Sequence, residues 1–147
     1  MDFTHLHLLI THLPIFGSLL GAMVLIYGLY KNSHQTVLAA YLVLVIASLG
    51  GLISYLTGEP AEETVEKIHG ISKSVIDSHE ESAEIAIISL AILGIFSLFV
   101  LVFNVKLIAF KRQIALVILA FSIICFGLVA RTGYLGGQIR HTEIRNP

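Results

Sequence analysis

The chain has 147 residues, of which 56% are hydrophobic and only 13% are charged, and its formal net charge is −1. A soluble domain carries about 25% charged residues, so this composition excludes an ordinary soluble protein and indicates a membrane protein, with no nucleic acid as a partner. The single cysteine, Cys125, excludes an intrachain disulfide and a CxxCH haem attachment motif.

Four apolar stretches are each long enough to cross the hydrocarbon core of a bilayer as a helix, which takes about 20 residues. They lie at about 8–30, 36–57, 85–105 and 113–132. The first has no Lys or Arg before it and no small-residue cleavage site after it, so we interpret it as a retained helix and not as a signal peptide. We expect an all-α fold, in which residues 1–147 form one antiparallel four-helix transmembrane bundle.

The connections between the spans differ in charge. Two are short and contain no acidic residue, and they hold the basic residues Lys31, Lys106, Lys111 and Arg112. The connection between the second and third spans is long and acidic. An excess of Lys and Arg in short loops marks the cytoplasmic side. We therefore expect a multi-pass protein of a bacterial inner (cytoplasmic) membrane, with both termini and the acidic connection outside, on the periplasmic face.

Part of the acidic connection has helical character. Pro60 and Gly70 stand where the first turn and the residue after the end of a short helix would lie. We therefore expect a short helical cap on the outer side at about 58–80, followed by a long third helix for which Ser72 is a candidate N-cap.

Two groups of glycines carry predictions. After the fourth span a turn is expected to end the helix at Gly133, Gly136 and Gly137. In the first span, a small-xxx-small face permits close contact with another helix and consists of Gly17, Gly21 and Gly28. This face lies opposite His5 and His12, so if the histidines point into the bundle, the glycines contact another copy or another membrane subunit. Packing within the chain is the alternative.

Six of the seven histidines fall on the expected outer side and none lies in the middle of a span, which excludes a cytochrome with haems stacked through the bilayer. At about 1.5 Å per residue, counting from the inner ends of the spans places a group of polar side chains near the outer membrane boundary: His12, Tyr55, Glu84 and Arg131. One to two turns further out lies a second group: His5, His7, His79 and Glu80.

These residues suit two kinds of cofactor. A transition-metal ion such as Fe, Cu or Zn would take imidazole and carboxylate ligands, for which the candidates are His12, His79, Glu80 and Glu84. A haem b would take axial imidazoles and pair its propionates with arginines, for which the candidates are His12, His79, His141, Arg131 and Arg140. The alternative is that no cofactor is bound, the histidines are solvated at the interface and Arg131 snorkels. Replacement of His5, His7 or His69 is expected to have little effect on the amount of haem or metal bound.

Four segments carry a family resemblance, in chain order: HLLITHLPIFGSLLG, TGEPAEETVE, HEESAEIA and TGYLGGQIRHTEIR. They resemble small bacterial four-span membrane proteins of, or near, the family known as domain of unknown function 2231. The positions that fit the family's pattern are His12, Pro14, Glu59, Glu62, His79, Glu80, Glu84, Arg140 and His141, and His5 and His69 fit it less clearly. Because some relatives look joined to Rieske or cytochrome domains, the resemblance implies a redox setting.

The function expected from these observations is electron transfer within a respiratory or related redox assembly, by a membrane protein with a His/Glu-lined haem or metal site on its outer face. We do not expect an independent enzyme. The alternative is a non-catalytic accessory or structural subunit of a membrane complex, without a cofactor. A transporter or channel is disfavoured because the spans lack ionisable residues at mid-membrane.

Overall fold

The computed structural model describes residues 3–65, 73–103 and 111–141, and these ranges are helical apart from short turns. The helices are α1 (Phe3–Ile10), α2 (His12–Tyr30), α3 (His34–Val65), α4 (Lys73–Val102) and α5 (Lys111–Arg140). Helices α1 and α2 together make one span, so four stretches are long and apolar enough to cross a membrane: Phe3–Tyr30, His34–Glu62, Lys73–Val102 and Arg112–Ile139. The predicted all-α, four-span fold is confirmed.

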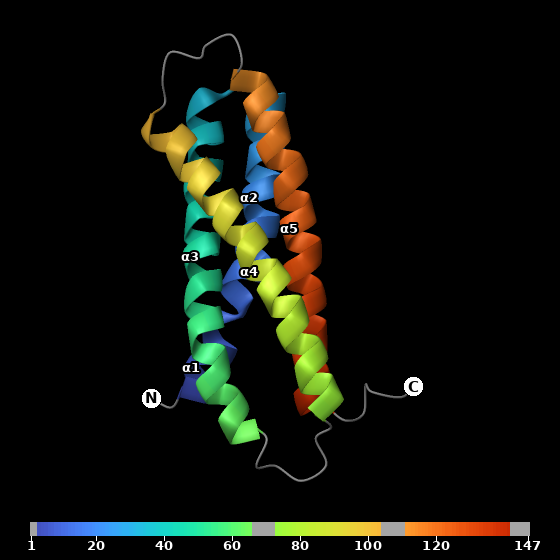
Figure 1. Cartoon of the computed structure of the whole chain (residues 1–147). Coiled ribbons are helices and arrows are strands. Elements are labelled where there is room, and N and C mark those ends of the chain that lie inside the picture. The colour runs from blue at the N-terminus through green and yellow to red at the C-terminus, as the bar shows by residue number, and fades with distance from the viewer. Residues whose placement is uncertain (1–2, 66–72, 104–110, 142–147) are drawn as a thin grey trace.

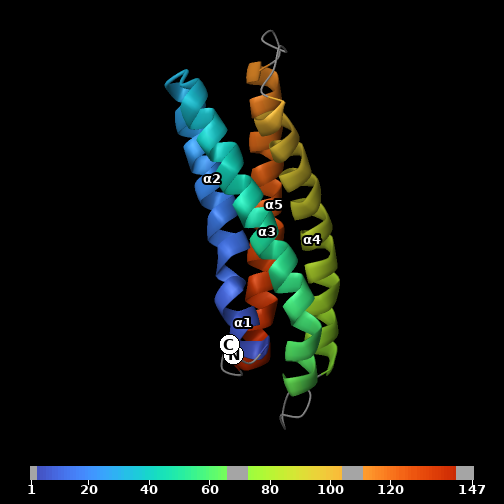
Figure 2. The same ribbon diagram turned by 90° about the vertical axis from the view of Figure 1, so that its left-hand side faces the viewer.

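The four spans run antiparallel as a bundle (Figures 1 and 2). Helix α2 packs against α3 and α5, α4 also packs against α3 and α5, and α1 lies against α3. One end of the bundle, which we call the terminal end, holds the start of α1, the end of α3, the start of α4 and the end of α5 (Figure 1). The opposite end, which we call the basic end, carries Lys31 and Arg112.

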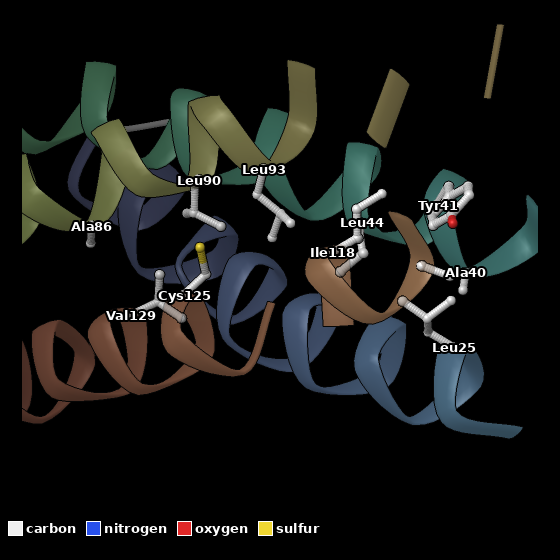
Figure 3. Packing of buried hydrophobic residues seen from close by; sticks show 11 residues of the cluster. Leu25, Ala40, Tyr41, Leu44, Ala86, Leu90, Leu93, Ile118, Cys125 and Val129 are labelled. Atoms are coloured by element: carbon white, nitrogen blue, oxygen red, sulfur yellow. The ribbon is translucent and has the colours of Figure 1, made fainter. Parts of the chain in front are cut away.

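A buried apolar cluster lies between α2, α3, α4 and α5 (Figure 3). Leu25, Leu44 and Leu93 are completely buried in it. By contrast, large apolar side chains on the outside of the bundle are exposed, among them Ile88 and Ile95. An apolar surface of this extent suits lipid and not water, so the bundle is built to contact the bilayer.

The glycines of α2 face α3 inside the bundle. A Cβ atom on Gly17 would lie 2.7 Å from the Cβ of Ala47, and one on Gly21 would overlap the side chain of Leu44. All three glycines, Gly17, Gly21 and Gly28, are buried within the chain. The prediction that this face contacts another copy or subunit is therefore wrong, because close packing against α3 already covers it.

The opposite face of the same span points outward, so His5 and His12 are exposed. The span is interrupted at Thr11, whose hydroxyl donates to the carbonyl of Leu8 at 3.0 Å. The interruption lies just before Pro14, which has no N–H for a helical hydrogen bond and disfavours a continuous helix before it.

Residues 58–65 extend α3 and do not form a separate cap, which corrects that part of the expected 58–80 cap. Pro60 lies inside the helix, where it removes one backbone donor. The helix continues past it, and Ala61 is buried against the bundle. The segment 66–72, with Gly70 and Ser72, lies outside the described residues, and the last part of the expected cap belongs to α4.

Helix α5 likewise continues through its three C-terminal glycines to Arg140, so the turn expected there is not formed. Gly133 and Gly136 allow other helices to come close. A Cβ atom on Gly133 would lie 2.7 Å from the side chain of Ile15, and one on Gly136 would lie 3.0 Å from the ring of His79.

The helices are longer than the membrane is thick. Helix α4 has 30 residues, about 45 Å at 1.5 Å per residue, whereas the hydrocarbon core is about 30 Å thick. Counted from the basic end, about 20 residues of each span fill the hydrocarbon. The first turns of α1 and α4, with His7 and His79, therefore lie beyond it at the terminal end.

Candidate functional site

Two half-buried histidines at the terminal end are held in the same way. Nδ1 of His7, on α1, lies 2.9 Å from the carbonyl oxygen of Ser54 on α3. Nδ1 of His79, on α4, lies 3.0 Å from the carbonyl oxygen of Thr132 on α5. A carbonyl oxygen only accepts, so each Nδ1 carries the proton, and Nε2 of the neutral ring keeps its lone pair. Histidines that bind metals are commonly oriented in this manner.

Both rings have a pKa below the ordinary range of a histidine. Burial lowers the pKa of both imidazoles below the ordinary value of 6.5, and the hydrogen bond to a carbonyl offsets this only in part. A charge on His7 further lowers the pKa of His79, while the carboxylate of Glu80 raises it. The surroundings of the two rings thus favour their neutral forms at pH 7.

Each of these rings lies near a glycine of a neighbouring helix. The Cε1 atom of His7 lies 3.6 Å from the position of a Cβ on Gly58, and that of His79 lies 3.0 Å from the position of a Cβ on Gly136. The second contact is so close that an alanine there would push the ring of His79 aside. The lack of a side chain at Gly136 therefore allows the ring of His79 to take this position.

A chain of hydroxyl groups connects α4 with α5 beside His79. The Oγ of Ser82, which is 2% exposed, lies 2.8 Å from the Oγ1 of Thr132 and accepts a hydrogen bond from Nη1 of Arg131 at 3.0 Å. The Thr132 hydroxyl itself donates to the carbonyl of Leu128, so Ser82 is the donor to Thr132. His79 and Arg131, both predicted as site residues, are thereby joined in one polar network.

The other predicted ligands are not hydrogen-bonded into this network. Nδ1 of His12 is bonded to the carbonyl of Leu8 in its own span, at 3.1 Å, and its ring stacks on Phe16. Glu80 and Glu84 are exposed. Within the described ranges, no three or more His, Cys, Asp or Glu side chains are placed to hold a metal ion. The proposed set of His12, His79, Glu80 and Glu84 is therefore not assembled.

Two of the predicted site residues, Arg140 and His141, lie at the end of α5. Helix α5 ends at Arg140, whose side chain lies outside the described residues. His141 follows directly and is exposed, and its backbone N–H donates to the carbonyl of Gly137 at 2.9 Å. It does not complete a three-residue metal group with other described side chains. His69 also lies outside the described residues.

His7 is a candidate site residue that was not predicted from the sequence. A signal for it is present, because His7 is separated by steps of seven from Pro14, Gly21 and Gly28. Steps of seven keep residues near one face of a helix, and these three residues are buried. His79 has the same relation to Ala86 and Leu93 in α4, which are also buried.

Comparisons of the chain with family models, with curated proteins and with solved structures found no match. The resemblance to domain of unknown function 2231 stays a prediction, and the interpretation of the site rests on the geometry of the chain.

Proposed function

We propose that the chain binds one haem b through Nε2 of His7 and Nε2 of His79 and transfers electrons within a respiratory or related redox assembly. One observation carries the proposal. The two imidazoles come from different helices at the same end of the bundle, and each is fixed by donation from Nδ1 to a backbone carbonyl. This arrangement leaves the second nitrogen of each ring available to iron.

The number of ligands favours haem over a metal ion bound by protein alone. A haem can be held by one or two side chains of the protein, whereas structural zinc sites take four protein ligands and catalytic ones three. The described residues offer no group of three. Thr4 also fits a bound group. It precedes His7 by about one helical turn, and its buried hydroxyl has no hydrogen-bond partner among the described residues.

The protein residues would hold the group and adjust its surroundings. His7 and His79 would hold it as neutral rings, which Ser54 and Thr132 orient, and Gly136 leaves room for the ring of His79. Arg131 is exposed and donates to Ser82 through one of its five N–H groups, which leaves others for a propionate. A haem in this position supplies one-electron transfer close to the membrane surface.

The proposal is tested by the optical spectrum of the purified protein and of three single variants. The wild type should show a Soret band and reducible α and β bands. His7→Ala and His79→Ala should each lose most of the haem, because each removes one axial ligand. His12→Ala should keep it. A colourless wild type, or full haem content in both the His7 and His79 variants, would contradict the proposal.

The orientation in the membrane is part of the proposal and rests on Lys31 and Arg112 at the basic end. It places the terminal end on the periplasmic side. A cysteine introduced at Ser78 should react with an impermeant thiol reagent added outside intact cells, and one at Asn32 should react only after the membrane is opened. Reaction at Asn32 in intact cells would reverse the orientation.

One observation favours the accessory-subunit function as a second candidate. The hydrogen bond of His7 joins α1 to α3, and that of His79 joins α4 to α5. Such bonds stabilise a bundle without any cofactor. His79→Asn distinguishes the two functions, because an amide retains a donor but does not replace the imidazole as an iron ligand. A structural role predicts unchanged stability and a colourless wild type.

A further inference from the structure

A second candidate site lies at the basic end, far from the histidine pair. A half-open cavity of about 300 Å³ lies between the end of α2, the start of α3, the end of α4 and the start of α5. This volume is at the lower limit of the range found for small-molecule sites, about 300 to 1,000 Å³. His34 at one end of it and His7 are separated by most of the length of the bundle, so the cavity is independent of the proposed haem site.

The cavity combines an apolar interior with a polar mouth. Phe96, Phe99 and Val100 of α4 line its wall, and Asn32 and Arg112 lie where it reaches the membrane surface. Arg112 makes this mouth positively charged, and no acidic residue is among the described residues that line the cavity. A ligand for this space has an apolar, flat body that can lie against phenylalanine rings and carries polar groups that accept hydrogen bonds.

Tyr41 supplies the most specific requirement. Its side chain is 2% exposed, lines the cavity and lies at one end of the buried cluster (Figure 3). Its hydroxyl forms no hydrogen bond with a described residue, whereas the buried Ser48 further along α3 donates to the carbonyl of Leu44. Unlike the unpartnered hydroxyls of Thr4 and Ser97, this hydroxyl is not fully enclosed by protein atoms, so it reaches the cavity that Tyr41 lines. A hydroxyl donor in an apolar cavity is unfavourable without an acceptor. A ligand with a carbonyl oxygen below the level of the head groups would supply that acceptor.

The cavity also has a route to the lipid. Phe99 and Phe103 line both the cavity and a shallow apolar groove on the outer face of α4, which is completed by Ile95, Leu98 and Val102. A long apolar tail attached to a ring in the cavity can therefore leave along this groove into the bilayer.

We propose that this cavity binds the head group of a membrane quinone, with one ring carbonyl accepting a hydrogen bond from Tyr41, the other directed toward Arg112, and the tail in the groove on α4. A quinone has a flat ring, two carbonyl acceptors at opposite ends and an apolar tail. A fatty-acyl chain would fill the same space but leave the Tyr41 hydroxyl without an acceptor, so the observations favour the quinone.

The test uses the full chain in lipid vesicles that contain no quinone, with a photoreactive azidoquinone that bears a ten-carbon tail as the probe. Labelling should be saturable, map to α4 between Phe96 and Phe103, and be displaced by the unmodified decyl quinone. Tyr41→Phe should weaken binding roughly three- to tenfold, since it removes one hydrogen bond. Tyr55→Phe is the matched control, because Tyr55 is an exposed tyrosine of the same helix, near the terminal end.

Three results would overturn the proposal. One is labelling spread evenly over the lipid-facing sides of all four spans. Another is equal affinity of the wild type and Tyr41→Phe for the probe. The third is displacement by oleate at the same concentration as by the decyl quinone, which would show a cavity for acyl chains.

Discussion

Two interfaces of the bundle are held together in different ways, and their depth in the membrane accounts for the difference. Within the hydrocarbon, α2 approaches α3 through Gly17 and Gly21, where backbone comes close to the side chains of the partner. At the terminal end, α4 and α5 are joined by hydrogen bonds from His79 and Ser82. Polar and ionisable groups are costly in lipid. Close packing therefore joins the helices inside the membrane, and hydrogen bonds between polar side chains join them at its edge.

The largest expected effect is on the glycine interface. Gly21→Leu places a side chain where Leu44 already lies, and overpacking of this kind costs about 1 to 3 kcal/mol of unfolding free energy. Gly127→Leu is the matched control, because a Cβ on Gly127 meets nothing within 4 Å. Unfolding in mild detergent measures both variants. Equal stability of the two would show that α2 and α3 do not pack through Gly21.

A smaller effect is expected at the polar interface. Ser82→Ala removes the acceptor of Arg131 and the donor to Thr132, which should lower the free energy of unfolding by roughly 1 kcal/mol. Ser89→Ala, on the same helix, removes only a bond to the carbonyl of Ile85 one turn away and should change stability by about 0.5 kcal/mol or less. The same denaturation measurement compares them. A larger loss in Ser89→Ala would contradict the role of Ser82 between the helices.

The smallest expected effect is a dependence on pH that only the polar interface shows. The folded pKa values of His7 and His79 lie below the ordinary value of 6.5. As the pH falls below about 6.5, the unfolded chain therefore binds protons before the folded one, and stability decreases until the folded rings are protonated too. Unfolding curves at pH 7.5 and pH 5 should show this loss. His79→Asn should reduce it, and an undiminished loss in that variant would assign the dependence to other groups.

Much of this fold follows from the sequence, because span length and apolar composition alone define helices that cross a bilayer. The sequence also places His7 and His79 in one group, one to two turns beyond the outer membrane boundary. The sequence analysis was less successful in choosing which face of the first span carries the candidate ligand. His12 was preferred to His7 because it lies at the expected membrane boundary and fits the family pattern, but its ring lies on the exposed face of the span, whereas His7 shares the buried face of Pro14 and Gly21.

Other expectations failed because contacts between helices override local preferences. Gly136 is typical of a helix end when the sequence is considered by itself. In the structure it continues α5, because the ring of His79 needs the space that a side chain would occupy. Likewise, Pro60 favours a new helix locally, yet the residues after it extend α3 and bury Ala61. A single sequence does not state which helix will lie opposite a given glycine.

The most direct test of the histidine pair is the reduction potential of the haem in His7→Met, measured by a spectroscopic redox titration of the purified protein. If His7 is an axial ligand, exchange for a thioether gives His/Met ligation and raises the potential, with an altered spectrum. His12→Met, on the exposed face of the same span, should leave both unchanged. A His7→Met protein with the potential and spectrum of the wild type would show that His7 does not bind the iron.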